Sequence, residues 1–341
     1  MKFTVAVAVL IAGLGATTAA HAATVNYTLY MTEADKTIAP TLAGKTYTRM
    51  FWVEGFTNVS GGLPFIGGVT LNSNEGDTVN ITVINQTQES HDFEVKGSGV
   101  AKVTIAAGAS AFVALPTTLK AGDYIYYDSS TDAQTKQLNR AVGMYGALVV
   151  RPAGQIAGGA GNLWAGGPAY KYDFTWVLSD FDKLWNQADK NKVAAPTAYK
   201  ATYAFINGDF GHGSFKNASV SPKQKVGDTI AIRIVNPGII AHPIHFHGYH
   251  GEVWRVDNVQ QTRILEKDVI DVGPMQTVDL IFHINQKGMY IIHDHTGMMV
   301  TQDGIYAEGM VGIFDTCTKE GGLVSACDKF CPTPSIGVPN C

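Results

Sequence analysis

Two short segments near the end of the chain concentrate its histidines. The first holds His242, His245 and His247, and the second holds His293 and His295. On a β-strand, residues two apart project from the same face, so His245 pairs with His247 and His293 pairs with His295. Neutral imidazole is a ligand that suits copper, zinc or nickel. If the two segments form neighbouring strands, four imidazoles can converge on one metal site.

The alternative is that these histidines are ordinary surface or hydrogen-bonded residues, as most single histidines are. Four imidazoles on one face would be an unusual coincidence, so we favour the metal site. His212 lies between glycines and His283 stands alone in an apolar strand, and we interpret both as structural because neither has a visible partner. His250 is out of phase with His245 and His247, so we expect a neighbour of the site rather than a ligand.

An internal repeat defines the elements that would position these residues. Residues 75–85 recur as residues 226–236, at an offset of 151 positions. Both copies read as a Gly-Asp turn that leads into a strand with apolar residues at every second position, the period of a strand with one buried face. Residues 122–128 recur as residues 288–294 at an offset of 166, which predicts a loop insertion of 15 residues in the second copy.

Each copy is a set of short strands, which predicts an all-β protein of two tandem, homologous β-sandwich domains. We expect residues 23–152 to form the first domain and residues 168–315 to form the second. The Gly/Ala-rich residues 153–167 between them are interpreted as a linker.

The histidine segments also resemble a known family. The segment from His242 to Gly248 reads His-Pro-Ile-His-Phe-His-Gly, similar to the His-Pro-x-His-x-His-Gly motif of multicopper oxidases. His293-x-His295, followed later by Gly-Met, resembles their closing His-Cys-His and Gly-Met motif. The resemblance spans both repeats and implies two cupredoxin-like Greek-key domains, as in two-domain laccase-like oxidases and copper nitrite reductases. It implies copper as the cofactor.

The same likeness implies roles for the individual histidines. His242 would bind a type 1 copper. His245 and His247 would serve the type 2 and type 3 coppers, and His293 and His295 would serve the type 3 pair. Two-domain relatives form trimers whose metal centres lie between subunits, so the likeness also implies a homotrimer.

Several positions depart from the family pattern. The family has a cysteine between the last two histidines, whose thiolate binds the type 1 copper, and this chain has Asp294. The first-domain positions that match the four cluster histidines are Glu94, Lys96, Tyr127 and Ser129. We therefore expect one or two metals rather than a complete three-copper cluster. Asp294 and Glu94 are the candidates for a catalytic role, Glu94 as a ligand or a proton relay.

Both repeats keep a His, an Asp and a Met where a type 1 site would be. These trios are His91, Asp128 and Met144 in the first domain, and His242, Asp294 and Met310 in the second. One interpretation is a thiolate-free copper site in each domain. The other is a buried His–Asp hydrogen bond, because a buried carboxylate without a partner is costly. We favour the hydrogen bond in the first domain and leave both open in the second, where the pair could brace the histidine cluster.

The amino-terminal segment points to an exported protein, and the charge of the chain argues against some partners. Residues 1–22 combine Lys2, an apolar stretch and Ala-His-Ala, which is typical of a secretory signal peptide and predicts a periplasmic or secreted location. No later segment is apolar enough to span a bilayer. The net charge of −4 and the lack of a basic run argue against a nucleic-acid or anionic-membrane partner.

All four cysteines lie in the tail formed by residues 316–341, at Cys317, Cys327, Cys331 and Cys341. In an exported protein, such a cluster predicts two disulfides that staple a tail with little core of its own. A four-thiolate zinc site is the alternative.

Two functions remain open from these observations. The first is a copper oxidoreductase whose histidine site takes electrons directly from a substrate and passes them to a small-molecule oxidant such as oxygen or nitrite. The second is a non-enzymatic protein that binds copper ions for storage, delivery or resistance, a role that suits Met298 and Met299 because thioethers prefer Cu(I). A purely structural role is disfavoured by the grouped imidazoles.

Overall fold

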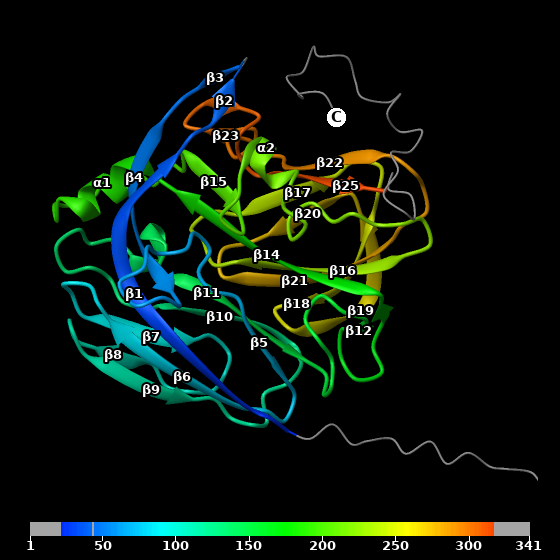
Figure 1. Cartoon of the computed structure of the whole chain (residues 1–341), viewed down its shortest axis with the longest axis horizontal. Helices are drawn as coiled ribbons and strands as arrows, with labels where there is room; N and C mark the ends of the chain where they lie inside the picture. The colour runs from blue at the N-terminus through cyan, green and yellow to red at the C-terminus, as the bar shows by residue number, and fades with distance from the viewer. Residues whose placement is uncertain (1–21, 43, 317–341) are drawn as a thin grey trace, which may run out of the picture.

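The computed structural model describes residues 22–42 and 44–316 and shows an all-β protein built from two β-sandwiches (Figure 1). The predicted all-β, cupredoxin-like fold is confirmed. The signal segment up to residue 21 and all four cysteines, with their predicted disulfides, lie outside the described residues. The boundaries of the two predicted domains stay a prediction.

The first sandwich consists of a four-stranded and a five-stranded sheet. The four-stranded sheet has the order β4 (Arg49–Thr57), β1 (Thr24–Ile38), β6 (Thr78–Asn85) and β9 (Ser110–Ala114). The second has the order β5 (Leu71–Asn74), β11 (Tyr145–Arg151), β10 (Gly122–Asp128), β7 (His91–Val95) and β8 (Val103–Ile105). Alternate residues of β6 are buried, as the apolar period predicts, and Ile81 packs with Leu29 and Phe93 between the sheets.

The second sandwich pairs a six-stranded with a four-stranded sheet. The larger sheet has the order β15 (Tyr203–Ile206), β14 (Tyr172–Phe181), β16 (Thr229–Asn236), β21 (Gln276–His283), β18 (Gly251–Val256) and β19 (Val259–Lys267). The smaller sheet has the order β20 (Val269–Val272), β17 (His242–Phe246), β22 (Met289–Asp294) and β25 (Val311–Asp315). Trp176 and Phe246 stack at the centre of its core, with ring centroids 6.0 Å apart.

Short elements complete the described chain. They are β2 (Thr41–Leu42), β3 (Lys45–Thr46), η1 (Asn139–Val142), β12 (Gly161–Asn162), β13 (Ala169–Tyr170), α1 (Lys183–Lys190), α2 (Gly211–Ser214), β23 (Thr301–Gln302) and β24 (Ile305–Tyr306). The Gly/Ala-rich segment predicted as a linker carries β12 and the fully buried Leu163, which packs with Tyr170. No helix in residues 22–42 or 44–316 is long and apolar enough to cross a membrane.

The strand pairing reproduces the internal repeat of the sequence. β6 and β16 occupy equivalent places beside a parallel partner, β1 in one sandwich and β14 in the other. β7 and β17 also occupy equivalent places, because each pairs with the strand that carries the repeated aspartate. That strand is β10 for β7 and β22 for β17. The hairpin of β18 and β19 lies between β17 and β22 in the sequence and has no counterpart between β7 and β10, so it accounts for the longer second copy.

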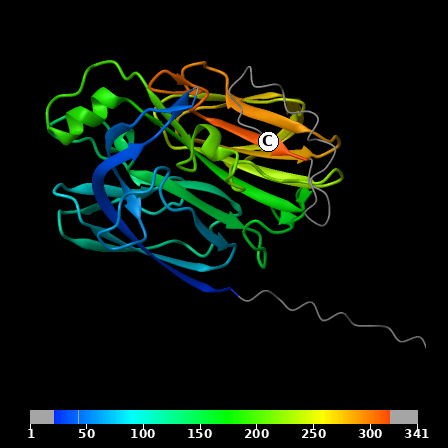
Figure 2. The same cartoon turned by 45° about the horizontal axis from the view of Figure 1, so that its top comes forward.

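The six-stranded sheet of the second sandwich packs against the five-stranded sheet of the first and against β4 of its four-stranded sheet. Ile125 and Tyr145 of the first sandwich contact Val177 and Val235 of the second. The fully buried Arg233 lies 3.1 Å from Asp173 and 3.5 Å from both Asp123 and Asp279, so the contact layer is also neutralised by ion pairs. The four-stranded sheet of β20, β17, β22 and β25 therefore lies on the side of the second sandwich away from the first (Figures 1 and 2).

Candidate metal centre

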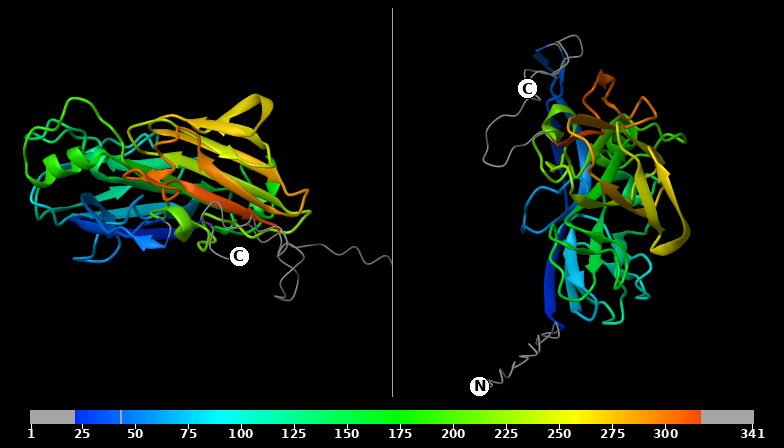
Figure 3. Two further views of the ribbon diagram at one scale, coloured as in Figure 1. Left: turned by 90° about the horizontal axis from the view of Figure 1, so that it is seen from above. Right: turned by 90° about the vertical axis from the view of Figure 1, so that its right-hand side faces the viewer.

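The histidine pairs lie on adjacent strands of this outer sheet. β17 and β22 are antiparallel, and His245 is directly opposite His293 in their register. The alternate residues Ile244 and Phe246 of β17 point into the hydrophobic core. Because side chains alternate along a strand, the histidines are on the opposite, outward face of the sheet. Figure 3 gives two further views of the ribbon.

The structure brings three of the predicted ligands together. One ring nitrogen from each of His245, His247 and His293 lies within 4.8 Å of the other two. The two closest atoms are Nε2 of His247 and Nε2 of His293, which are 3.1 Å apart. Two imidazole nitrogens on one tetrahedral metal at a bond length of about 2.0 Å would be roughly 3.3 Å apart. The spacing of the closest pair therefore fits ligands of a shared metal.

Backbone carbonyls hold two of these rings in place. Nδ1 of His245 lies 3.1 Å from the carbonyl oxygen of Asp268, and Nδ1 of His293 lies 2.9 Å from that of Asp294. A carbonyl only accepts hydrogen bonds, so each Nδ1 carries the proton and each Nε2 keeps its lone pair. This is the usual way in which a metal-binding histidine is oriented. The donor set is therefore prepared for a metal that prefers imidazole, as copper does.

The cluster also favours the neutral form that a metal requires. Partial burial, together with the charges that His245, His293 and His295 would carry, lowers the pKa of His247. Crowded imidazoles cannot all be protonated without mutual repulsion. Residues 245, 247, 293 and 295 are nevertheless half-buried or exposed, so solvent and small molecules can reach the site.

His295 lies at the edge of this group. Its ring centroid is 5.4 Å from that of His245 and 5.7 Å from that of His293. It is not one of the three whose nitrogens gather within 4.8 Å, so it borders the site as a possible fourth ligand. Of the two methionines that follow, Met299 is buried in the core while Met298 is exposed.

His242 is placed apart from the cluster, inside the domain. Its Nδ1 lies 2.7 Å from Oδ2 of Asp294, and its Nε2 lies 3.3 Å from Oδ2 of Asp180. Burial by itself lowers the pKa of this histidine, but the hydrogen bonds to Asp180 and Asp294 outweigh burial and raise the pKa to about 9. His242 is therefore a cation held between two carboxylates at neutral pH, with both ring nitrogens engaged.

Asp294 belongs to the same buried pair. Its Oδ1 accepts hydrogen bonds from the backbone N–H and hydroxyl of Thr296, at 2.7 and 2.6 Å. The carboxylate thus lies on the core side of β22, away from His293 and His295. Its predicted catalytic role, like the type 1 role of His242, stays a prediction.

The first domain repeats this pair without the neighbouring cluster. His91 Nδ1 lies 2.6 Å from Oδ2 of Asp128, and the repeated Met144 packs in the hydrophobic core. Here Nε2 of His91 faces the hydroxyl of Thr87 at 2.7 Å, where His242 faces a second carboxylate. Both domains therefore contain a buried His–Asp hydrogen bond at these positions.

Glu94 lies in the first sandwich, on β7 opposite Tyr127 of β10. Burial, followed by the charge of Glu94, raises the pKa of Tyr127. Tyr127 packs toward the interface with the second sandwich, whereas the histidine cluster is on the far sheet of that sandwich. Within one chain, Glu94 is therefore not brought to the cluster, and its predicted role is untested.

Sequence reasoning missed two carboxylates that partner histidines. Asp180 is 62 residues from His242, and Glu308 is 96 residues from His212, whose Nδ1 it contacts at 2.6 Å. His212 therefore has the partner that the sequence did not reveal. The sequence carries no local signal for either contact, because both depend on how distant strands pack.

Comparison with known proteins agrees with this architecture. The family model described as multicopper oxidase matches residues 182–312, which include all the cluster histidines. The solved structure of the multicopper oxidase mgLAC is 21% identical with a TM-score of 0.68, and the match covers 89% of each chain. The blue copper oxidase from Nitrosomonas europaea is 19% identical with a TM-score of 0.66, and the match covers 86% of each chain.

The copper nitrite reductase from Nitrosomonas europaea is 18% identical with a TM-score of 0.59, and the match covers 88% of this chain and 97% of that one. A search of curated protein sequences finds no match. At these identities the solved structures establish the fold. The predicted resemblance to two-domain copper oxidases and nitrite reductases is confirmed, in a chain with Asp294 in place of the type 1 cysteine, and copper is the metal that the family match implies.

Proposed function

We propose that this chain, which has the fold of the multicopper oxidases, is a copper oxidoreductase whose type 2/type 3-like centre works without a type 1 relay. The observation that carries the proposal is the group of His245, His247 and His293, whose nitrogens lie within 4.8 Å of one another on the outer sheet. Copper bound there would supply one-electron chemistry by cycling between Cu(II) and Cu(I).

The residues around the centre define how electrons would arrive. A thiolate relay would require cysteine at position 294, and this position holds a carboxylate that points into the core. The electron donor must therefore reach the histidines directly. The partial exposure of His245 and His293 supports direct access for a small substrate and a small oxidant such as oxygen or nitrite.

The buried pair of His242 and Asp294 would act as a brace. Asp294 is the residue between His293 and His295, so its hydrogen bonds to His242 and Thr296 fix the end of β22. A fixed strand end keeps the Nε2 atoms of the cluster in place for a metal. In this account the pair positions the ligands and does not itself contact the copper.

Oxygen or nitrite consumption with a small reductant such as ascorbate tests the enzymatic function. Copper-loaded protein is expected to consume one oxidant catalytically, over many turnovers per copper. In a His245→Ala, His293→Ala double variant, the rate of oxidant consumption should fall to that of the same amount of chelated copper without the protein. A His283→Ala variant is the matched control, because this exposed histidine pairs with Glu252 outside the cluster.

Non-enzymatic copper storage or delivery is the alternative. The exposed Met298, which follows the cluster, favours it because a thioether is a soft ligand for Cu(I). Copper that binds at the histidines and leaves only to a chelator or partner, with no turnover, would establish this alternative and exclude the enzymatic function.

We also propose that the protein is exported to the periplasm or secreted, and that it assembles as a homotrimer. The amino-terminal sequence supports export. The exposed apolar side chains of Ile291, Met298 and Tyr306, close to the histidines, support burial of this face by another subunit. Mass measurement of the mature protein tests export, and sedimentation analysis tests the homotrimer.

A further inference from the structure

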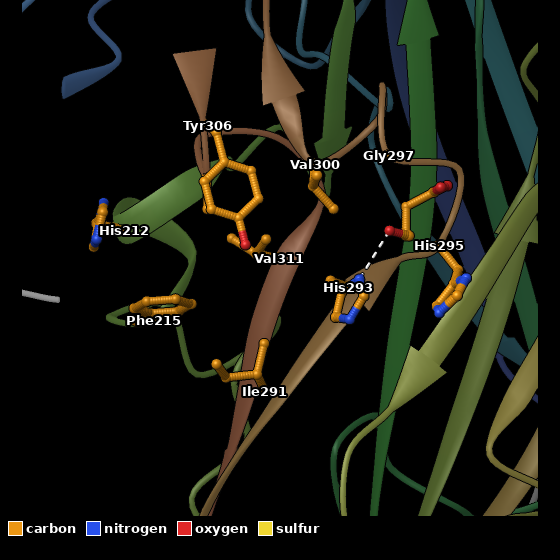
Figure 4. A pocket seen from close by; sticks show the side chains of 11 residues that line it. His212, Phe215, Ile291, His293, His295, Gly297, Val300, Tyr306 and Val311 are labelled. Carbon is orange, nitrogen blue, oxygen red and sulfur yellow. Dashed lines mark hydrogen bonds between the residues drawn. The ribbon is translucent and has the colours of Figure 1, made fainter. Parts of the chain in front are cut away.

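A groove of about 530 Å³ lies on the seam between the two sandwiches. It is separate from the smaller cavity beside His293 and His295 that Figure 4 shows. One wall comes from residues 67–72 of the first sandwich, and the other comes from residues 173–177 of β14. In the described chain, β15 pairs with β14 only from Leu178 onward, so no strand lies beside this part of β14 on that side. This gap at the sheet edge makes room for the groove.

Arg151 lines this groove with a partly unpaired guanidinium group. Its side chain is only 3% exposed. Nε donates to Oδ2 of Asp173 and Nη1 donates to Oδ1 of Asn72, both at 2.7 Å. Nη2 makes no hydrogen bond to another residue in the part of the chain that the structure describes, yet it is not among the fully buried unpaired atoms. The small exposed part of Arg151 therefore includes Nη2, and it opens into the groove.

The carboxylate of Asp173 does not cancel the charge of Arg151. It is fully buried and is shared by two guanidinium groups, because Nε of Arg233 lies 3.1 Å from the same Oδ2. Burial, followed by the charge of Asp279, raises the pKa of Asp123, which lies beside Arg233, and so favours its neutral form. A guanidinium group stays charged at any physiological pH. The groove therefore offers a positive hydrogen-bond donor that an anion can meet.

Two hydroxyl groups and apolar side chains complete the lining of the groove. Thr70 comes from the first sandwich and Thr175 from the second, and both are half-buried. Neither hydroxyl bonds to another residue within the described ranges, and neither is fully buried, so both can reach a ligand. Phe174, Val177 and Ala218 add apolar surface. A largely apolar lining with a few polar groups that fix orientation is typical of a site for a small organic molecule.

We infer that this groove binds an organic carboxylate with an apolar body of about two rings. The carboxylate accepts a hydrogen bond from Nη2 of Arg151, and the body lies along Phe174 and Val177. Phosphate is a poorer match, because only one nitrogen of the guanidinium group is free. The volume exceeds the roughly 150 Å³ that holds one benzene ring. The groove is remote from the outer sheet that carries the histidines, so binding does not depend on the proposed function.

Isothermal titration calorimetry of the full chain tests the inference with naphthoate and its neutral isostere naphthamide. The two probes have the same rings, so they differ only in the charge that meets Arg151. Naphthoate should bind about tenfold more tightly, because a hydrogen bond to a charged group contributes roughly that factor. Equal affinity for the two probes, tighter binding of naphthamide, or no binding of naphthoate would overturn the inference.

Variants of the groove locate the binding. Ala218→Trp fills the groove from an exposed position and should abolish binding of both probes. Ala107→Trp places the same ring on the exposed turn between β8 and β9, outside the groove, and should change neither affinity. An Arg151→Gln, Asp173→Asn double variant removes both charges and should reduce naphthoate to the affinity of naphthamide. Unchanged binding in Ala218→Trp, or a retained preference for naphthoate in the double variant, would contradict the proposed site. Thermal unfolding verifies that each variant is folded.

Discussion

His242 Nδ1 lies 2.7 Å from Oδ2 of Asp294, and the internal repeat reproduces the contact at 2.6 Å between His91 and Asp128. In both domains the aspartate also accepts a hydrogen bond at 2.6 Å from a hydroxyl two residues later, Ser130 or Thr296. A buried, fully hydrogen-bonded carboxylate thus occupies the position where a copper-binding thiolate would stand. The second domain differs because it adds the histidine cluster on the other face of the same strand.

Removing the carboxylate of Asp294 is expected to destabilise the protein strongly. Asp294→Ala leaves a buried, charged His242 with one partner fewer, and the free energy of unfolding should fall by about 3–5 kcal/mol. Urea denaturation measures this change. Asp268→Ala is the control, because Asp268 is 53% exposed and its carboxylate lies 3.9 Å from His245, so its loss should cost less than about 1 kcal/mol. Similar costs for the two variants would contradict the bracing role.

The raised pKa of His242 predicts that stability falls with increasing pH. The folded pKa is about 9, above the unfolded value, so the stabilisation is complete below about pH 6.5 and is lost as the pH rises through 9. The full contribution is on the order of 3 kcal/mol. Asp180→Asn removes one of the two carboxylates and should flatten this dependence between about pH 6.5 and 9.

The first domain provides the control for this pH experiment. Thr87 occupies the place of Asp180 beside the second ring nitrogen of the repeated histidine, His91. Thr87→Val should therefore lower stability by a similar amount at every pH. Urea unfolding of both variants between about pH 6.5 and 9 measures how the free energy of unfolding of each depends on pH. If Asp180→Asn keeps the wild-type slope, the charged state assigned to His242 is wrong.

The sequence was sufficient for the repeat, the strand faces and the three histidines that the structure brings together. Apolar alternation predicted β6 and β16, and spacing by two paired His245 with His247 and His293 with His295, each pair on one face of its strand. These signals are local, so a single sequence reveals them. The pairing of His242 with Asp180, and of His212 with Glu308, depends on contacts across 62 and 96 residues. Local patterns cannot specify which distant carboxylate meets a given imidazole.

Lys192 joins the two sandwiches, and its removal should destabilise them. Its ammonium lies 3.0–3.7 Å from carboxylate oxygens of Glu54, Glu89, Asp132 and Asp189. Burial raises the pKa of Glu54, with a further increase from Asp189, so this site is crowded with negative charge. Lys192→Met should lower the free energy of unfolding by about 3–5 kcal/mol, because buried carboxylates lose their counter-ion.

Lys190 is the matched control for this experiment. It pairs with Asp35 at 2.6 Å, but both side chains are about one-third exposed, at 35% and 36%. Lys190→Met should therefore change the free energy of unfolding by less than about 1 kcal/mol. Calorimetric unfolding of the two variants gives the comparison. An equal effect at the two positions would show that Lys192 is only a surface charge.

EPR spectroscopy with metal analysis on copper-loaded protein tests the central claim most directly. The account predicts a type 2 Cu(II) spectrum without the intense blue absorption of a thiolate-bound copper, and loss of that spectrum in a His293→Ala, His295→Ala double variant. Asp294→Asn, which keeps the cluster histidines, should retain the copper. Wild-type protein that holds no copper, or a double variant that binds copper equally well, would contradict the histidine centre.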